Sequence, residues 1–85
     1  MNAILHGNFK KKFKKLPLPV RSRFKERLCL FLENKFNPIL NNHSVNVTFP
    51  GCRSINVTGD YRAIFKEEGE DIIFINIGTH SELYG

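Results

Sequence analysis

The chain has 85 residues, of which 41% are hydrophobic and eight are phenylalanine. This composition excludes a disordered polypeptide, and the length predicts a single domain, residues 1–85, with a small core. No apolar run is long enough to cross a membrane and the first residues lack the pattern of a signal peptide, so we expect a cytoplasmic protein. Two cysteines without a cluster of metal ligands predict free thiols and neither a metal nor a cofactor, whereas the net charge of +5 predicts an anionic partner.

The positive charge is concentrated in the first half of the chain. Ten of the thirteen Lys and Arg residues precede position 36, and six of the eight acidic residues follow position 59. A cationic surface of this kind attracts a nucleic-acid backbone or an acidic protein. Charge alone does not choose between these two partners.

A short first strand is expected at residues 3–6. A helix then follows with Asn8 as its N-cap, because Phe9 and Phe13 recur at helical spacing. The other faces of this helix carry lysines, which form either a solvated surface or a site for a polyanion. The candidates for polyanion contacts are Lys10, Lys11, Lys14, Lys15 and, from the next helix, Arg21.

The second helix is expected to be the longest. It begins near Pro19, after a Leu-Pro-Leu-Pro segment that stops the first helix, and it ends at Asn37 and Pro38. Because the link is short, the two helices should form an antiparallel hairpin. The apolar stripe that we expect in the core follows the 3.6-residue period: Val20, Phe24, Leu28, Phe31 and Leu32.

The second half of the chain has the two-residue period of strands. From Asn41 onward, Val45, Val47 and Phe49 alternate with polar residues, which predicts a strand with one buried face. Three further strands are expected at residues 53–57, 61–66 and 72–77, separated by turns rich in Gly, Asp and Glu.

The turn between the expected strands at residues 53–57 and 61–66 decides which side chains share a face. A three-residue loop pairs Ile55 with Ala63 and collects the apolar residues of both strands on one face. A two-residue loop would mix apolar and charged residues there, so we expect the three-residue loop. This register places three polar residues together on the opposite face: Ser54, Asn56 and Arg62.

The expected order of elements is therefore a strand, two helices and four strands. It predicts an α+β fold in which an N-terminal helix hairpin packs on one face of a mainly antiparallel sheet of four to five strands. The other face should stay open. The last eight residues follow a buried strand and contain His80 and Tyr84, so they form either a functional segment or a fraying terminus.

The polar groups that could carry chemistry lie on or around the open face: His43, Asn56, Asp60, Arg62, His80 and Tyr84. Such a set suffices for cleavage of RNA without a metal. Histidine can take a proton from the 2′-hydroxyl and return one to the leaving oxygen, arginine can hold the phosphate, and an aromatic ring can stack on a base. Taken singly, each of these residues is more often structural than catalytic.

Five segments carry a family resemblance: Phe9 to Leu16, Asn41-Asn42-His43, Gly51-Cys52-Arg53-Ser54-Ile55, Gly59-Asp60-Tyr61-Arg62, and Gly78-Thr79-His80 followed by Leu83-Tyr84-Gly85. Through them the chain resembles the RelE superfamily of bacterial type II toxins, and most closely its YafQ branch. The resemblance implies an endoribonuclease that cuts mRNA, usually in the ribosomal A site. It also implies a protein that is monomeric when free and is silenced in a hetero-oligomer with a cognate antitoxin.

The resemblance also assigns roles to residues. It implies that His43, Asp60 and His80 form the acid-base set, that Arg62 stabilises phosphate charge, and that Tyr84 contacts the substrate. We expect further substrate contacts from Arg53, Ser54 and Asn56, and contacts of the lysine-rich surface with the antitoxin or the RNA backbone. The YafQ pattern has a further histidine where this chain has Asn56, and an asparagine does not transfer protons at neutral pH.

Two other functions remain open on the sequence. One is that of the related ParE branch, which poisons DNA gyrase; His43 and His80 argue against it. The other is a catalytically silent module that binds its antitoxin and contributes to operator repression.

Overall fold

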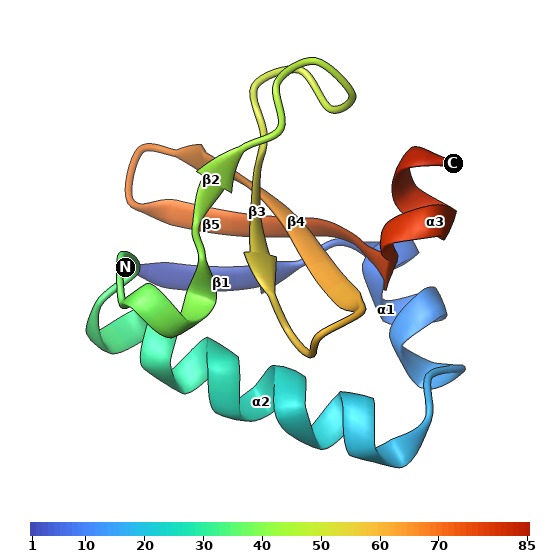
Figure 1. Cartoon of the computed structure of the whole chain (residues 1–85). Coiled ribbons are helices and arrows are strands. Elements are labelled where there is room, and N and C mark those ends of the chain that lie inside the picture. The colour runs from blue at the N-terminus through green and yellow to red at the C-terminus, as the bar shows by residue number, and fades with distance from the viewer.

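Alternating apolar residues build a five-stranded sheet in the computed structural model, which describes all of residues 1–85 (Figure 1). Its strands are β1 (Asn2–Leu5), β2 (His43–Ser44), β3 (Arg53–Asn56), β4 (Tyr61–Glu68) and β5 (Asp71–Thr79). They are arranged in the order β1-β5-β4-β3-β2. β1 runs parallel to β5 and every other pair is antiparallel, so the predicted α+β fold with a mainly antiparallel sheet is confirmed.

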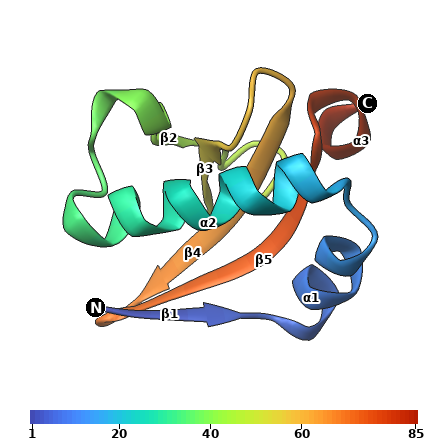
Figure 2. The same ribbon diagram turned by 90° about the horizontal axis from the view of Figure 1, so that it is seen from below.

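Two helices, α1 (Gly7–Lys14) and α2 (Leu18–Glu33), cover one face of the sheet, and in Figure 2 α2 lies across the strands. The main core lies between these helices and the sheet. Rings from both layers meet there: the centroid of Phe74 lies 5.9 Å from that of Phe9 and 5.4 Å from that of Phe24. Each fully buried Phe stabilises the fold by about 1.5–3 kcal/mol relative to an exposed one. No helix is both long and apolar enough to cross a membrane.

The ends of both helices differ from the prediction. The N-cap of α1 is His6 and not Asn8, because the extended backbone of His6 brings its Nδ1 within 3.2 Å of the Asn8 amide, which donates to it. α2 ends at Glu33, four residues before Asn37, because Asn34 adopts an extended conformation with φ of −157°. Asn37 instead caps a 3₁₀ helix, η1 (Pro38–Leu40).

One side chain predicted for the core of α2 is outside it. Leu32 is 42% exposed, whereas Val20, Phe24 and Phe31 are buried. Leu30 packs against the core from the last turn instead.

The predicted strand at residues 45–49 is wrong. β2 contains only His43 and Ser44, and residues 45–52, which we call the rim loop, form turns. The amides of Thr48 and Phe49 both donate to the carbonyl oxygen of Val45, at 3.1 and 2.8 Å, so the backbone bonds locally and not to a neighbouring strand. Apolar alternation therefore does not mark a buried face here.

The predicted register of β3 and β4 is confirmed, since Ile55 pairs with Ala63 and Asn56 pairs with Arg62. A bulge between β4 and β5 was not predicted. Phe65 pairs with Phe74 while Ile64 pairs with Asn76, so β5 has one extra residue at this point. The bulge lets Phe74 and Ile77, three positions apart, both face the helices.

The second face of the sheet is only partly open, contrary to prediction. A smaller cluster of Val45, Cys52, Ile64 and Leu83 is buried on it. Leu83 belongs to a short C-terminal helix, α3 (His80–Tyr84), which folds back over the sheet next to the rim loop (Figure 1). The polar candidates of β3 and β4 consequently lie beside packed apolar side chains.

Candidate functional site

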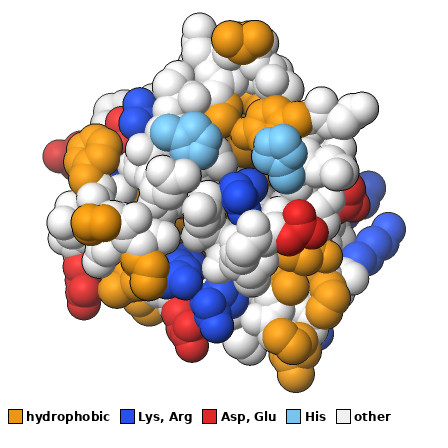
Figure 3. Space-filling view, viewed as in Figure 1, with side chains coloured by type: hydrophobic (Ala, Val, Ile, Leu, Met, Phe, Trp, Pro, Cys, Tyr) orange, Lys and Arg blue, Asp and Glu red, His pale blue; other side chains and the backbone are white.

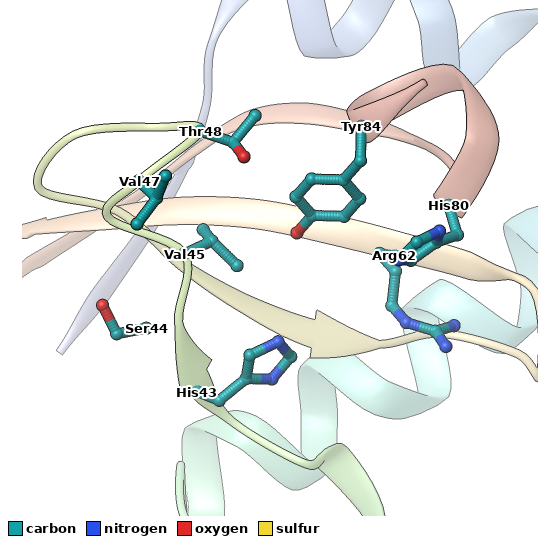
Figure 4. Close-up of a pocket in the computed structure, with 8 residues that line it drawn as sticks. All are labelled: His43, Ser44, Val45, Val47, Thr48, Arg62, His80 and Tyr84. Atoms are coloured by element: carbon teal, nitrogen blue, oxygen red, sulfur yellow. The ribbon is translucent and has the colours of Figure 1, made fainter.

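A pocket of about 240 Å³ opens between the rim loop, β2, β4 and α3. In the space-filling view two histidine side chains flank a hollow with hydrophobic atoms in it (Figure 3). Eight residues line the pocket: His43, Ser44, Val45, Val47, Thr48, Arg62, His80 and Tyr84 (Figure 4). Four of the six polar candidates from the sequence therefore meet in one place, although they come from three separate parts of the chain.

His43 is held in one tautomer. Its Nδ1 lies 2.7 Å from the carbonyl oxygen of Asn41, which can only accept a hydrogen bond, so Nδ1 carries the proton. Asn41 has a left-handed backbone with φ of 47°, a conformation that asparagine tolerates, and this turn places the carbonyl beside the ring. In the neutral ring, Nε2 therefore has a free lone pair, as a general base requires.

Arg62 is anchored to the turn that precedes its own strand. Its Nη1 donates to the carbonyl oxygens of Thr58, Gly59 and Tyr61 at 3.1, 3.2 and 3.2 Å. These bonds hold the guanidinium at the side of the pocket next to His80 (Figure 4). Nε and Nη2 have no protein partner, so they remain available as paired donors to an anion.

A capping box fixes the start of α3. The Oγ1 of Thr79 accepts from the amide of Glu82 at 3.2 Å, and Oε1 of Glu82 accepts from the amide of Thr79 at 2.8 Å. The hydrogen bond from the Thr79 backbone, followed by that from its side chain, lowers the pKa of Glu82, and the charge of Lys12 contributes less. Leu83 anchors the other side of the helix in the smaller cluster.

α3 brings His80 and Tyr84 side by side. They are one turn apart, and their ring centroids are 4.8 Å from each other. The amide of His80 donates to the carbonyl oxygen of Asp60 at 3.1 Å, and the Tyr84 ring contacts Phe49 of the rim loop edge-on at 6.0 Å. The tail is thus folded over the face that carries Arg62 and is not a frayed end.

Two of the polar candidates do not line the pocket. The side chain of Asp60 is exposed and makes no hydrogen bond, and its contribution to the site is the main-chain bond to His80. Asn56 is half-buried opposite Arg62, and its Oδ1 is buried without a hydrogen-bond partner.

The further residues expected to contact substrate also lie outside the pocket. Ser54 is fully buried and its hydroxyl has no partner. Arg53 is on the opposite face of β3, where its Nε donates to Oδ1 of Asn42 at 2.8 Å and its guanidinium lies over the ring of Phe36.

The lysine-rich surface is separate from this pocket. Lys10, Lys11 and Lys14 are exposed on α1 and Lys15 is exposed at its C-cap, while Arg21 on α2 is half-buried. No group of three or more His, Cys, Asp and Glu side chains is close enough to hold a metal ion.

The rim loop is a part of the site that the sequence pattern does not predict. Val47 and Thr48 line the pocket, although the alternation of apolar and polar residues around them predicts a strand. The signal that points to a loop is Asn46 close to Pro50-Gly51, since Oδ1 of Asn46 accepts from the amide of Gly51 at 2.6 Å and Gly51 has φ of +75°.

One family model matches almost the whole chain. Residues 3–84 match a family model described as the ParE toxin of the type II toxin-antitoxin system parDE. A search of curated proteins found no match.

Solved structures share the fold at low sequence identity. YafQ from E. coli strain BL21(DE3) has a TM-score of 0.81 at 22% identity, over 99% of this chain and 98% of that chain. The DinJ-YafQ toxin-antitoxin complex of E. coli has a TM-score of 0.74 at 20% identity, over 99% of this chain and 97% of that chain. The RelB-RelE antitoxin-toxin complex of Methanococcus jannaschii has a TM-score of 0.76 at 21% identity, over 95% of this chain and 94% of that chain.

Proposed function

The chain belongs to the ParE toxin family of type II toxin-antitoxin systems, and we propose that it is an endoribonuclease that cleaves mRNA in the ribosomal A site. One observation carries the proposal: His43, Arg62 and His80 line a single pocket although they come from β2, β4 and α3. Two histidines and an anchored arginine are the groups that cleavage of a phosphodiester by its own 2′-hydroxyl requires.

The geometry of His43 supports a role as the general base. Its Nε2 takes the proton of the 2′-hydroxyl, and the 2′-oxygen attacks the adjacent phosphorus. His80, protonated at the start, gives its proton to the departing 5′-oxygen as the P–O bond breaks. The products are a 2′,3′-cyclic phosphate and a 5′-hydroxyl, and no metal takes part.

Arg62 and Tyr84 act on the charge and position of the substrate. Nε and Nη2 of Arg62 donate to the phosphate oxygens, whose negative charge grows as the phosphorus becomes five-coordinate. Tyr84 packs on His80 and offers its ring to an unstacked base. Asp60 positions His80 through its main chain, and Asn56, half-buried next to Arg62, contributes no proton transfer.

The partner that silences this activity is a cognate antitoxin, with which the otherwise monomeric toxin forms a hetero-oligomer in the cytoplasm. DinJ-YafQ is a toxin-antitoxin complex and RelB-RelE is an antitoxin-toxin complex. The basic surface of Lys10, Lys11, Lys14, Lys15 and Arg21 suits an acidic antitoxin segment or the phosphates of ribosomal RNA.

Expression without the antitoxin tests the proposal. We expect growth arrest together with cuts in translated messages, mapped by primer extension, and we expect both to disappear with His80→Ala. Ser81→Ala is the matched control, because Ser81 is the exposed next residue of the same helix and lines no pocket. Growth arrest with intact messages would overturn the proposal.

A second candidate function is inhibition of DNA gyrase, which the ParE name of the matching family favours. It predicts that the purified protein inhibits supercoiling of plasmid DNA by gyrase and that His43→Ala leaves this inhibition intact. If His80→Ala changed neither toxicity nor cleavage and gyrase were unaffected, a silent antitoxin-binding module would be the better description.

A further inference from the structure

The rim loop carries an apolar side chain in an unusual position. Val47 is 99% exposed, more than any other large hydrophobic residue of the chain, and it stands at the edge of the pocket. A single exposed apolar residue is common on protein surfaces. Val47, however, lies across the pocket from the basic side chains of Arg62 and His80, where a ligand bound to these groups would meet it.

The rim loop is also well anchored. Besides the bonds of Thr48 and Phe49 to Val45, the amide of Cys52 donates to the carbonyl oxygen of Phe49 at 3.0 Å. Val45 and Cys52, its first and last residues, are buried in the smaller cluster. Val47 is therefore exposed on a segment whose backbone is held in place, and this segment is suited to contact a ligand with little loss of conformational freedom.

The two sides of the pocket have different chemistry. On one side stand Arg62 and His80, and on the other stand Val47 and Thr48, with the ring of Tyr84 between them (Figure 4). A nucleotide has the same division, because its phosphate is anionic while its base has an apolar face and a hydrogen-bonding edge. With the phosphate at the basic side, the base points to the rim loop.

We propose that Val47 and Thr48 form the wall of the pocket that recognises the base of a single-stranded RNA nucleotide. The methyl groups of Val47 pack against the base, which Tyr84 contacts from the helix side. The hydroxyl of Thr48 donates to or accepts from the edge of the base and so distinguishes one base from another. The inference rests on the proposed ribonuclease function for the choice of ligand.

Binding to uncleavable RNA tests the inference apart from catalysis. Four 2′-O-methyl oligonucleotides that differ in one base lack the free 2′-hydroxyl and stay intact, so their Kd can be measured for the full-length wild type and for variants. Val47→Ser should weaken binding of the preferred oligonucleotide about tenfold. Thr48→Val should change the order of preference among the four bases.

The control variant is Ile39→Ser, which removes an exposed apolar side chain (52% exposed) that does not line the pocket. It should bind all four oligonucleotides as the wild type does. Because Val47 is almost fully exposed, its replacement is not expected to unfold the protein, and thermal unfolding of each variant checks this.

The outcomes separate the inference from the function on which it rests. The inference would be overturned if both rim-loop variants kept the wild-type ratios of the four Kd values. It would also be overturned if the wild type bound none of the oligonucleotides. If binding shows the expected changes but the matching 2′-hydroxyl RNAs are not cut, base recognition stands and the ribonuclease proposal fails. If those RNAs are cut but binding does not show the expected changes, the ribonuclease proposal stands and the inference of base recognition fails.

Discussion

Thr79→Ala should increase the fraction of molecules in which α3 is displaced from the site, without unfolding the protein. The substitution removes the hydroxyl that caps the helix by accepting from the amide of Glu82. Loss of an N-cap threonine costs about 1 kcal/mol, which raises the population of the displaced tail about fivefold. α3 has only five residues and depends on this cap and on Leu83, so the cost acts on the tail and not on the main core.

Hydrogen exchange measured by NMR gives the direct readout. The amides of residues 82–85 should exchange about fivefold faster in Thr79→Ala, while those of β4 and β5 should not change. Cleavage should weaken because His80 and Tyr84 leave the pocket more often. Thr79→Ser keeps the hydroxyl and should restore both properties, and Ser81→Ala is the control within the helix. Wild-type exchange and cleavage in Thr79→Ala would refute this account of the tail.

Three further predictions address other parts of the site. The pKa of Glu82 is lower in the folded state than in the unfolded state, so its contribution to holding α3 is complete above the unfolded-state pKa and is lost as the pH falls through the folded-state pKa. The NMR chemical shift of the Thr79 amide should follow this acid transition in the wild type and should not follow it in Glu82→Gln. Ser54→Ala should raise the free energy of unfolding by up to about 1 kcal/mol in urea titrations and leave cleavage unchanged, because the hydroxyl is buried without a partner; impaired cleavage would indicate a contact with substrate. Arg62→Lys should lower kcat about 100-fold, because lysine keeps the charge but lacks the paired donors, and a kcat near that of the wild type would exclude this role.

Much of the fold was predictable because burial of one face fixes strand pairing. The register of β3 and β4 followed from placing Ile55 and Ala63 on the same face, and the structure confirms it. The bulge at Ile64 and Phe65 was not predictable, since β5 reads as a continuous apolar run in which one extra residue leaves no local mark. The parallel pairing of β1 with β5 also depends on contacts between distant parts of the chain.

The site was predictable in its chemical groups but not in its boundaries. His43, Arg62, His80 and Tyr84 stood out as polar or aromatic residues beside strands, and the fold brings them together. The rim loop was missed because alternation of apolar residues is typical of a strand, while hydrogen bonds within the loop satisfy its backbone. Such local competition between turn and strand cannot be weighed from the apolar pattern alone.

The chemical identity of the cut ends tests the proposed cleavage mechanism. Purified protein would be incubated with translating ribosomes, and the 5′ and 3′ ends of the cleaved mRNA would be identified, for the wild type and for His43→Ala and His80→Ala. We expect 5′-hydroxyl and 2′,3′-cyclic phosphate ends from the wild type, and loss of cleavage in both variants. Ends with a 5′-phosphate, or unchanged cleavage by both histidine variants, would contradict this mechanism.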